Sequence, residues 1–201
     1  MGLREYYQKY VESSELHVEN IMKYGPMVPF GHPEPRPEQL ERIEFIASHA
    51  DGLVLDVGCD SGYILMRCGG GVGVDISLLR VKAAKHWYPR LSLVHAVAEH
   101  LPFKKEAFDT VVLAELLEHV LDPKAVLMEA FRVLKPTGRL VVTVPDEIHG
   151  KSHMNPEHLR KFTEGELRNL LNTCFDVEVL DYVVGEYPAF CAVCRKGEIL
   201  W

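Results

Sequence analysis

The sequence has little positive charge and no long apolar run. Its 201 residues include 22 Lys and Arg against 29 Asp and Glu, which gives a formal net charge of −7. No run of basic residues forms the positive stripe that binding to a phosphate backbone needs. No apolar stretch approaches the length of about 18 residues that a membrane-spanning helix needs. We therefore expect neither duplex nucleic acid as a partner nor insertion into a membrane.

The cysteines do not form a regular pattern. The five cysteines are an odd, scattered set, which favours reduced thiols over a disulfide framework: Cys59, Cys68, Cys174, Cys191 and Cys194. The last two fall in a predicted strand and are expected in the core. The opening residues MGLREYYQKY carry charges where a signal peptide has its apolar stretch. These features predict a cytoplasmic protein.

The first 37 residues differ in composition from the rest. Residues 1–24 are rich in aromatic and charged side chains, with Tyr6 and Tyr10 one helical turn apart, and predict a weakly amphipathic helix. Residues 25–37 hold five prolines, which exclude regular structure. We expect residues 1–37 to be a helical lid with a proline-rich connector, and residues 38–201 to form the main domain.

From residue 53 onward, short apolar runs alternate with segments of helix length. Strands are predicted at 53–57, 72–75, 91–96, 110–113 and 140–144, and helices at 37–49, 123–134 and 163–173. Leu40, Ile43, Ile46 and Ala47 should form the inner face of the helix at 37–49. Two last strands, 176–184 and 189–195, are close enough to form an antiparallel hairpin. The pattern predicts an α/β fold with a mostly parallel sheet and helices on both faces.

Ligands of such sheets bind beyond the carboxyl ends of the strands. After the first strand comes a glycine turn, Gly58 to Gly62, and the second strand ends at Asp75. A glycine turn followed by a strand-end acid indicates a nucleoside ligand. The dinucleotide fingerprint fails, because its second and third glycines would fall on Asp60 and Tyr63. A carboxylate at Asp60 would also repel a pyrophosphate, so the ligand is not expected to be held by its phosphates.

Several ordered motifs resemble the class I S-adenosylmethionine-dependent methyltransferases of type 11, over about residues 53–174. They are Val54 to Gly62, Gly73 to Ser77, Ala98 to Phe103, Phe108 to Val120 and Leu134 to Leu140. The resemblance implies a Rossmann-like sheet of seven strands and S-adenosylmethionine as the cofactor. It also implies that residues 38–201 are the methyltransferase domain.

The resemblance also implies roles for individual residues. Asp75 would hold the ribose, Ile76 would pack on the adenine, and the turn from Gly58 to Gly62 would pass under the methionine part. The full expected set of cofactor residues is Asp56, Gly58, Cys59, Asp60, Gly62, Asp75, Ile76, Ala98, Glu99 and Glu115. The chain departs from the family at Val97, where many members have an acid, at Asp60, and in a short first helix.

Methyl transfer from a sulfonium is an in-line displacement, so a base is needed only for protonated acceptors. Histidines after the fourth and fifth strands are the candidates for this role: His119, His149 and His153. Tyr6, Tyr10 and His158 are expected to cover the acceptor. His149, His153, Glu157 and His158 could also be read as a metal cluster, but Pro156 breaks any helix that would align them, and no metal is expected.

The expected function is methyl transfer to a small molecule. Two alternatives stay open. One is a methyltransferase that acts on RNA or protein through a local patch of charge, and the other is a cofactor-binding protein without transferase activity. The sequence alone leaves the acceptor atom and the oligomeric state undetermined.

Overall fold

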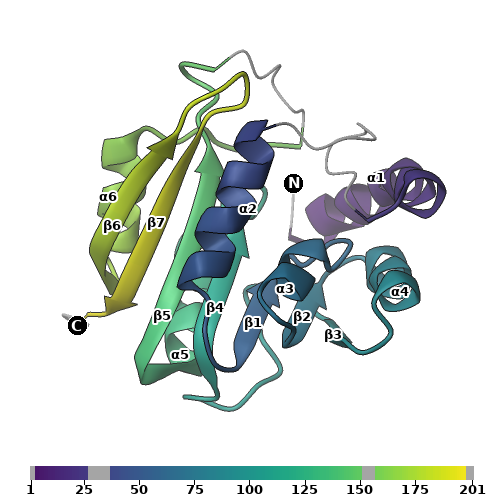
Figure 1. The fold of residues 1–201 in the computed structure, drawn as a ribbon, viewed down its shortest axis with the longest axis horizontal. Coiled ribbons are helices and arrows are strands. Elements are labelled where there is room, and N and C mark those ends of the chain that lie inside the picture. Colours follow the sequence, from purple (N-terminus) through teal and green to yellow (C-terminus); the bar gives the residue numbers. More distant parts are fainter. Residues whose placement is uncertain (1–2, 27–36, 151–156, 198–201) are drawn as a thin grey trace.

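A seven-stranded sheet with helices on both faces makes up the fold (Figure 1). The computed structural model describes residues 3–26, 37–150 and 157–197. The strand order is β3-β2-β1-β4-β5-β7-β6; β1 to β5 are parallel, and β7 and β6 join antiparallel. This topology confirms the predicted Rossmann-like sheet with its C-terminal hairpin. The strands are β1 (Val54–Val57), β2 (Val72–Asp75), β3 (Ser92–His95), β4 (Phe108–Ala114), β5 (Leu134–Pro145), β6 (Phe175–Val183) and β7 (Ala189–Lys196).

Six helices surround the sheet in the described part of the chain. They are α1 (Leu3–Tyr24), α2 (Pro37–His49), α3 (Tyr63–Arg67), α4 (Leu78–Trp87), α5 (Pro123–Val133) and α6 (Glu164–Leu171). Capping side chains mark where α5 and α6 begin. The Asp122 side chain accepts the Ala125 N–H at 3.0 Å ahead of α5, and Thr163 and Glu166 form a reciprocal capping box ahead of α6. No helix among the described residues is long and apolar enough to cross a membrane.

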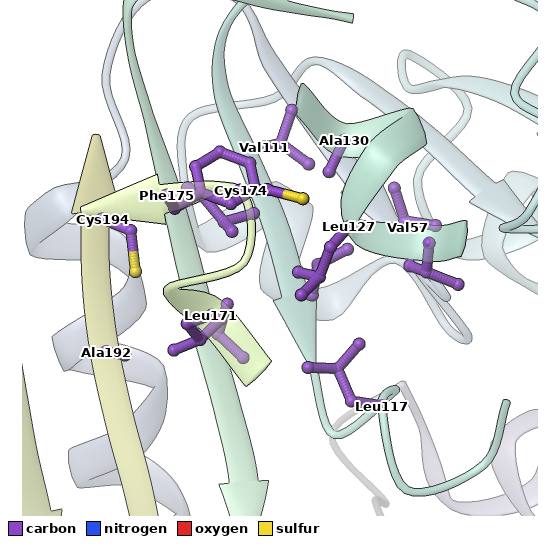
Figure 2. Packing of buried hydrophobic residues seen from close by; sticks show 14 of the residues in the cluster. Val57, Val111, Leu117, Leu127, Ala130, Leu171, Cys174, Phe175, Ala192 and Cys194 are labelled. Atoms are coloured by element: carbon purple, nitrogen blue, oxygen red, sulfur yellow. The ribbon is translucent and has the colours of Figure 1, made fainter. Parts of the chain in front are cut away.

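Apolar side chains fill both sides of the sheet. Strand residues alternate between the two faces, so Val111 and Val112 belong to different clusters. Figure 2 shows the larger cluster, where Leu127 and Ala130 of α5 and Leu171 of α6 meet the sheet. The opposite cluster joins Ile46 of α2 and Leu65 of α3 to the other face. The carboxyl ends of β1, β2 and β4 lie together at one edge of the sheet, which the two cores support.

The structure corrects three details of the sequence-based expectations. Leu40 points outward and is 39% exposed, and the buried face of α2 carries Gln39 and Arg42 beside Ile43 and Ile46. Residues 135–138, expected to be a turn, are the first part of β5, which follows α5 directly. Helix α4 has no one-sided apolar pattern and buries mainly two alanines, which is why periodicity did not reveal it.

Candidate active site

The turn between β1 and α3 has a fixed backbone. Gly58 and Gly62 have φ angles of 79° and 76°, and Asp60 also has a positive φ of 44°. The N–H groups of Gly58 and Cys59 both donate to the Val74 carbonyl, at 2.7 and 2.9 Å. A Cβ atom on Gly58 would lie 3.0 Å from Leu116, so this glycine is needed for both its φ and its close packing.

Asp75 stands at the end of β2, next to that turn. Its carboxylate accepts the Asp60 N–H at 3.0 Å and the Ser77 N–H at 2.8 Å, one on each oxygen. The side chain is 4% exposed and lines both cavities described below. Each carboxylate oxygen has a second lone pair, so Asp75 still has acceptor sites for ligand hydroxyl groups.

Two further carboxylates surround the turn. Asp56 is 1% exposed, and neither of its oxygens has a hydrogen-bond partner within residues 3–26, 37–150 and 157–197. Burial, together with the charges of Asp75 and Asp60, raises the pKa of Asp56 to about 7. Asp60 instead accepts a hydrogen bond from His17 of α1 at 2.9 Å and lies 3.6 Å from the Arg80 guanidinium. This acidic turn is suited to a ligand that carries positive charge.

A small apolar cavity of about 40 Å³ adjoins Asp75. Its lining includes the adenine-side residues expected from the sequence, Ile76 and Ala98, and also Tyr7 and Tyr10 of α1. The Tyr7 hydroxyl donates to Glu99, whose other oxygen is buried and has no partner. The cavity is too small for a purine ring while both tyrosines stay in place.

A larger cavity of about 310 Å³ lies between α2 and the ends of β1 and β4. It shares Tyr10, Gly58 and Asp75 with the small cavity, so the two adjoin. Gly58, Cys59, Asp60 and Glu115 of the expected cofactor set line it. Its far wall is the inner face of α2: Gln39, Arg42, Ile43 and Ile46.

A buried ion pair crosses the wall of the larger cavity. Arg42 Nη1 lies 2.7 Å from Glu115 Oε2, and the two side chains are 7% and 19% exposed. Glu115 directly follows β4 and has a φ of 51°, which is strained for a residue other than glycine. Its second oxygen, Oε1, has no hydrogen-bond partner in the described part of the chain. The strained backbone therefore presents an unpartnered carboxylate oxygen at the cavity wall.

Helix α1 covers the two cavities through one face. Tyr6, Tyr10, Ser14, His17 and Ile21 recur at helical spacing, and this face is turned to the domain. The Tyr6 hydroxyl donates to the His119 carbonyl at 2.6 Å, and Arg80 donates to the Tyr10 hydroxyl at 3.0 Å. The contact between His17 and Asp60 is a third tether.

The histidines expected to act as bases lie in different surroundings. His119 lines both cavities, and burial followed by the nearby His158 lowers the pKa of His119 to about 3. The His149 side chain is 70% exposed, hydrogen-bonds Asp146 at 2.9 Å and lines neither cavity. His153 lies outside the described residues. His158 contacts the His119 ring and does not line either cavity.

Sequence reasoning missed several residues of this region. They are His17, Arg42, Arg80 and Glu118, which belong to four different segments. Arg42 lies on the same helical face as Ile43 and Ile46, so a charge on an apolar face was the available signal. For His17, Arg80 and Glu118 the partners are distant in the sequence, and no local pattern marks them.

The comparisons with known proteins agree with this geometry. Residues 55–142 match a family model of type 11 that is described as a methyltransferase domain. A protein of Mycolicibacterium smegmatis, described as a probable S-adenosylmethionine-dependent methyltransferase, is 34% identical over 134 residues, which are 62% of this chain and 52% of that protein.

Other relatives differ in the acceptor that their names state. A ubiquinone biosynthesis O-methyltransferase of Idiomarina loihiensis is 35% identical over 49% of this chain and 46% of that protein. A tRNA U34 carboxymethyltransferase of Pseudoalteromonas atlantica is 38% identical over 51% of this chain and 35% of that protein. The chain thus spans about half the length, or less, of these curated relatives.

Among solved structures, the crystal structure of the (4+2)-cyclase SpnF has a TM-score of 0.77 and covers 94% of this chain and 96% of its own. At 19% identity this likeness shows the fold alone. The family model and the sequence relatives carry the assignment further. Residues 55–142 of this chain are thus similar to the type 11 methyltransferase domain, and its sequence relatives include S-adenosylmethionine-dependent methyltransferases.

Proposed function

We propose that this protein transfers the methyl group of S-adenosylmethionine to a small-molecule acceptor. The observation that carries the proposal is the 310 Å³ cavity, which is walled by α2, roofed by α1 and continuous with the Asp75 edge. Pockets of this size are typical of small-molecule sites. The similarity to this methyltransferase domain supports the choice of cofactor.

The described residues fit this cofactor. Asp75 would accept hydrogen bonds from the ribose hydroxyls, while Ile76 and Ala98 would contact the adenine. The unpartnered oxygens of Asp56 and the acidic turn suit the positive charges of the methionine part. When bound, S-adenosylmethionine supplies an electrophilic methyl group on a cationic sulfur.

The protein itself aligns the acceptor and excludes water. The apolar side chains of Ile43 and Ile46 and the cover of α1 would limit the access of water to the acceptor. Glu115 Oε1 is free to accept a hydrogen bond or a proton from the acceptor. Because burial lowers the pKa of His119 to about 3, its ring stays neutral and is a poor base near neutral pH.

We propose that residues 1–37 act as the lid of the domain formed by residues 38–201. The tethers of Tyr6, Tyr10 and His17 support this division for α1; residues 27–36 lie outside the described residues. Because Tyr7 and Tyr10 narrow the adenine side, the lid must shift before the cofactor enters. Entry and release should therefore depend on the contacts of α1.

Transfer of a radioactive methyl group tests the proposed acceptor class. The protein is incubated with methyl-tritiated S-adenosylmethionine and three fractions of a cell extract: a filtrate of small molecules, total RNA, and protein. We expect label in the small-molecule fraction. Label in RNA or protein would assign a macromolecular acceptor, and cofactor binding without label in any fraction would favour a binding protein without transferase activity.

A matched pair of variants distinguishes true turnover from contamination. Asp75→Asn should abolish most of the transfer, because the amide offers only one acceptor oxygen where the carboxylate offers two. Asp181→Asn changes an exposed acid on β6 that lines neither cavity, and this variant should transfer methyl groups as the unchanged protein does. Equal activity in both variants would mean that the label comes from another enzyme.

A further inference from the structure

A cluster of metal-ligating side chains lies beside the larger cavity. It consists of Glu118 and His119, in the loop after β4, and His158, in the segment before α6. One ligand atom from each side chain lies within 4.8 Å of the others. We propose that these three residues bind a divalent transition-metal ion, with zinc as the first expectation.

Glu118 supplies the strongest evidence. Its side chain is fully buried, at 0% exposure, and neither carboxylate oxygen has a hydrogen-bond partner among the described residues. A buried carboxylate needs a cation, a proton or hydrogen-bond donors, because moving its charge out of water costs on the order of several kcal/mol. The two guanidinium groups nearby are committed elsewhere: Arg42 to Glu115, and Arg160 to backbone carbonyls of the loop after β4. Within the described residues, no side chain donates a hydrogen bond to Glu118.

The two histidines are arranged as ligands. His158 Nδ1 lies 2.8 Å from Glu147 Oε1, and these side chains are only 9% and 2% exposed. This contact orients the ring and leaves its Nε2 for a metal, as in carboxylate–histidine–zinc arrangements. His119 Nδ1 is buried and has no hydrogen-bond partner in the part of the chain that the structure describes. The two rings meet edge to face, with centroids 4.5 Å apart.

The donor set indicates the class of ion. Two imidazole nitrogens and one carboxylate oxygen suit zinc and iron(II), whereas magnesium and calcium prefer oxygen ligands. Ligand atoms around a tetrahedral zinc lie about 3.4 Å apart, so binding would draw the three groups together. Three protein ligands leave a coordination position open, and His119 places the ion beside the cavities.

The sequence alone suggests a different metal cluster, made of residues that are neighbours along the chain: His149, His153, Glu157 and His158. In the structure, the His149 side chain is exposed and contacts Asp146. The His158 ring instead packs against the ring of His119, which is 39 positions away in the sequence. The metal site depends on this long-range contact and on Glu118. It does not depend on the proposed methyl transfer.

Metal binding by the full chain, without an affinity tag, tests the inference. The protein is treated with a chelator, dialysed, and titrated with Co²⁺ while its visible absorption is recorded; Zn²⁺ is then added as a competitor. We expect saturation at one Co²⁺ per chain and displacement by Zn²⁺. The metal content of the protein as purified identifies the natural ion.

Variants locate the site. Glu118→Gln and His158→Ala should each weaken binding at least tenfold, and Glu147→Gln should weaken it about 10- to 100-fold through the His158 ring. His149→Ala, which removes an exposed histidine outside the cluster, should bind as the unchanged protein does. Glu118→Gln is isosteric and removes a buried charge, so it should fold even if His158→Ala does not.

The inference is overturned if no saturable Co²⁺ or Zn²⁺ binding occurs. It is equally overturned if Glu118→Gln and Glu147→Gln bind as tightly as the unchanged protein, or if His149→Ala alone removes binding. Because the readout is metal binding and not turnover, failure of the methyl-transfer proposal leaves this result unaffected.

Discussion

Asp56 is a buried acid whose ionisation opposes folding. Its native pKa is raised to about 7, from an ordinary value of 3.8. The native state therefore holds a proton that the unfolded state releases between about pH 4 and pH 7, and stability falls as the pH rises through this window. Asp56→Asn removes the charge and should stabilise the ligand-free protein at pH 8 by about 1 to 4 kcal/mol.

Chemical denaturation at pH 4 and pH 8 measures this difference. At pH 4 Asp56 is protonated in the native state, so the gain from Asp56→Asn should nearly vanish. Asp181→Asn, on the exposed side of β6, serves as the control and should show no such dependence on pH. An equal effect of Asp56→Asn at both pH values would contradict the account.

The ion pair of Arg42 and Glu115 is buried, so removal of one partner leaves a charge without compensation. Arg42→Ala should lower the free energy of unfolding by about 3 kcal/mol. Arg67→Ala removes a more exposed partner of Glu44, with 39% and 62% of the two side chains exposed, and should cost less than about 1 kcal/mol. The double variant Arg42→Met with Glu115→Leu should recover most of the loss. Similar costs for the two single variants would contradict burial of the Arg42 pair.

At the scale of elements, α1 is held by a few specific contacts. Tyr6→Phe removes the hydrogen bond to the His119 carbonyl, which is worth about 1 kcal/mol. If α1 covers the cofactor, release of S-adenosylhomocysteine should become about fivefold faster, since about 1.4 kcal/mol corresponds to a factor of ten. Stopped-flow fluorescence measures this rate. Lys9→Ala, in the exposed ion pair with Glu5 on α1, should leave it unchanged; an unchanged rate in Tyr6→Phe as well would argue against a lid.

The elements themselves were largely predictable. The bounds of α2 and β2 agree with the sequence-based expectation, and the capping signals at Asp122 and Thr163 are present in the structure. These features depend on residues within one or two turns of each other. The inner face of α2 was not predictable in full, because Arg42 is buried only through Glu115, 73 positions away.

The positions of the glycine turn and of Asp75 at the strand ends were predictable from local motifs, and their role in cofactor binding stays a prediction. The contacts that close the site depend on the tertiary fold. Tyr7 meets Glu99 across 92 positions, and His17 meets Asp60 across 43. In neither pair does the local sequence around one residue identify its partner. The histidines illustrate the same limit, since only the fold separates the exposed His149 from His119.

For the whole molecule, stability depends on the core between the sheet and α5. Leu127 is fully buried there, and Leu127→Ala should lower the free energy of unfolding by about 2 to 5 kcal/mol. Met128→Ala, at the next position of α5 and 45% exposed, should change it by less than about 0.5 kcal/mol. Urea denaturation compares them. Because neither position lines either cavity, cofactor affinity of the folded protein should stay the same. Equal destabilisation by both variants would contradict the packing.

Calorimetry with S-adenosylhomocysteine tests the central claim, that a nucleoside cofactor binds at the edge formed by the Gly58 to Gly62 turn and Asp75. We expect saturable binding with one site per chain, weakened about 10- to 100-fold by Asp75→Asn and unchanged by Asp181→Asn. No heat from either S-adenosylhomocysteine or S-adenosylmethionine, or heat that Asp75→Asn leaves unaltered, would contradict the account.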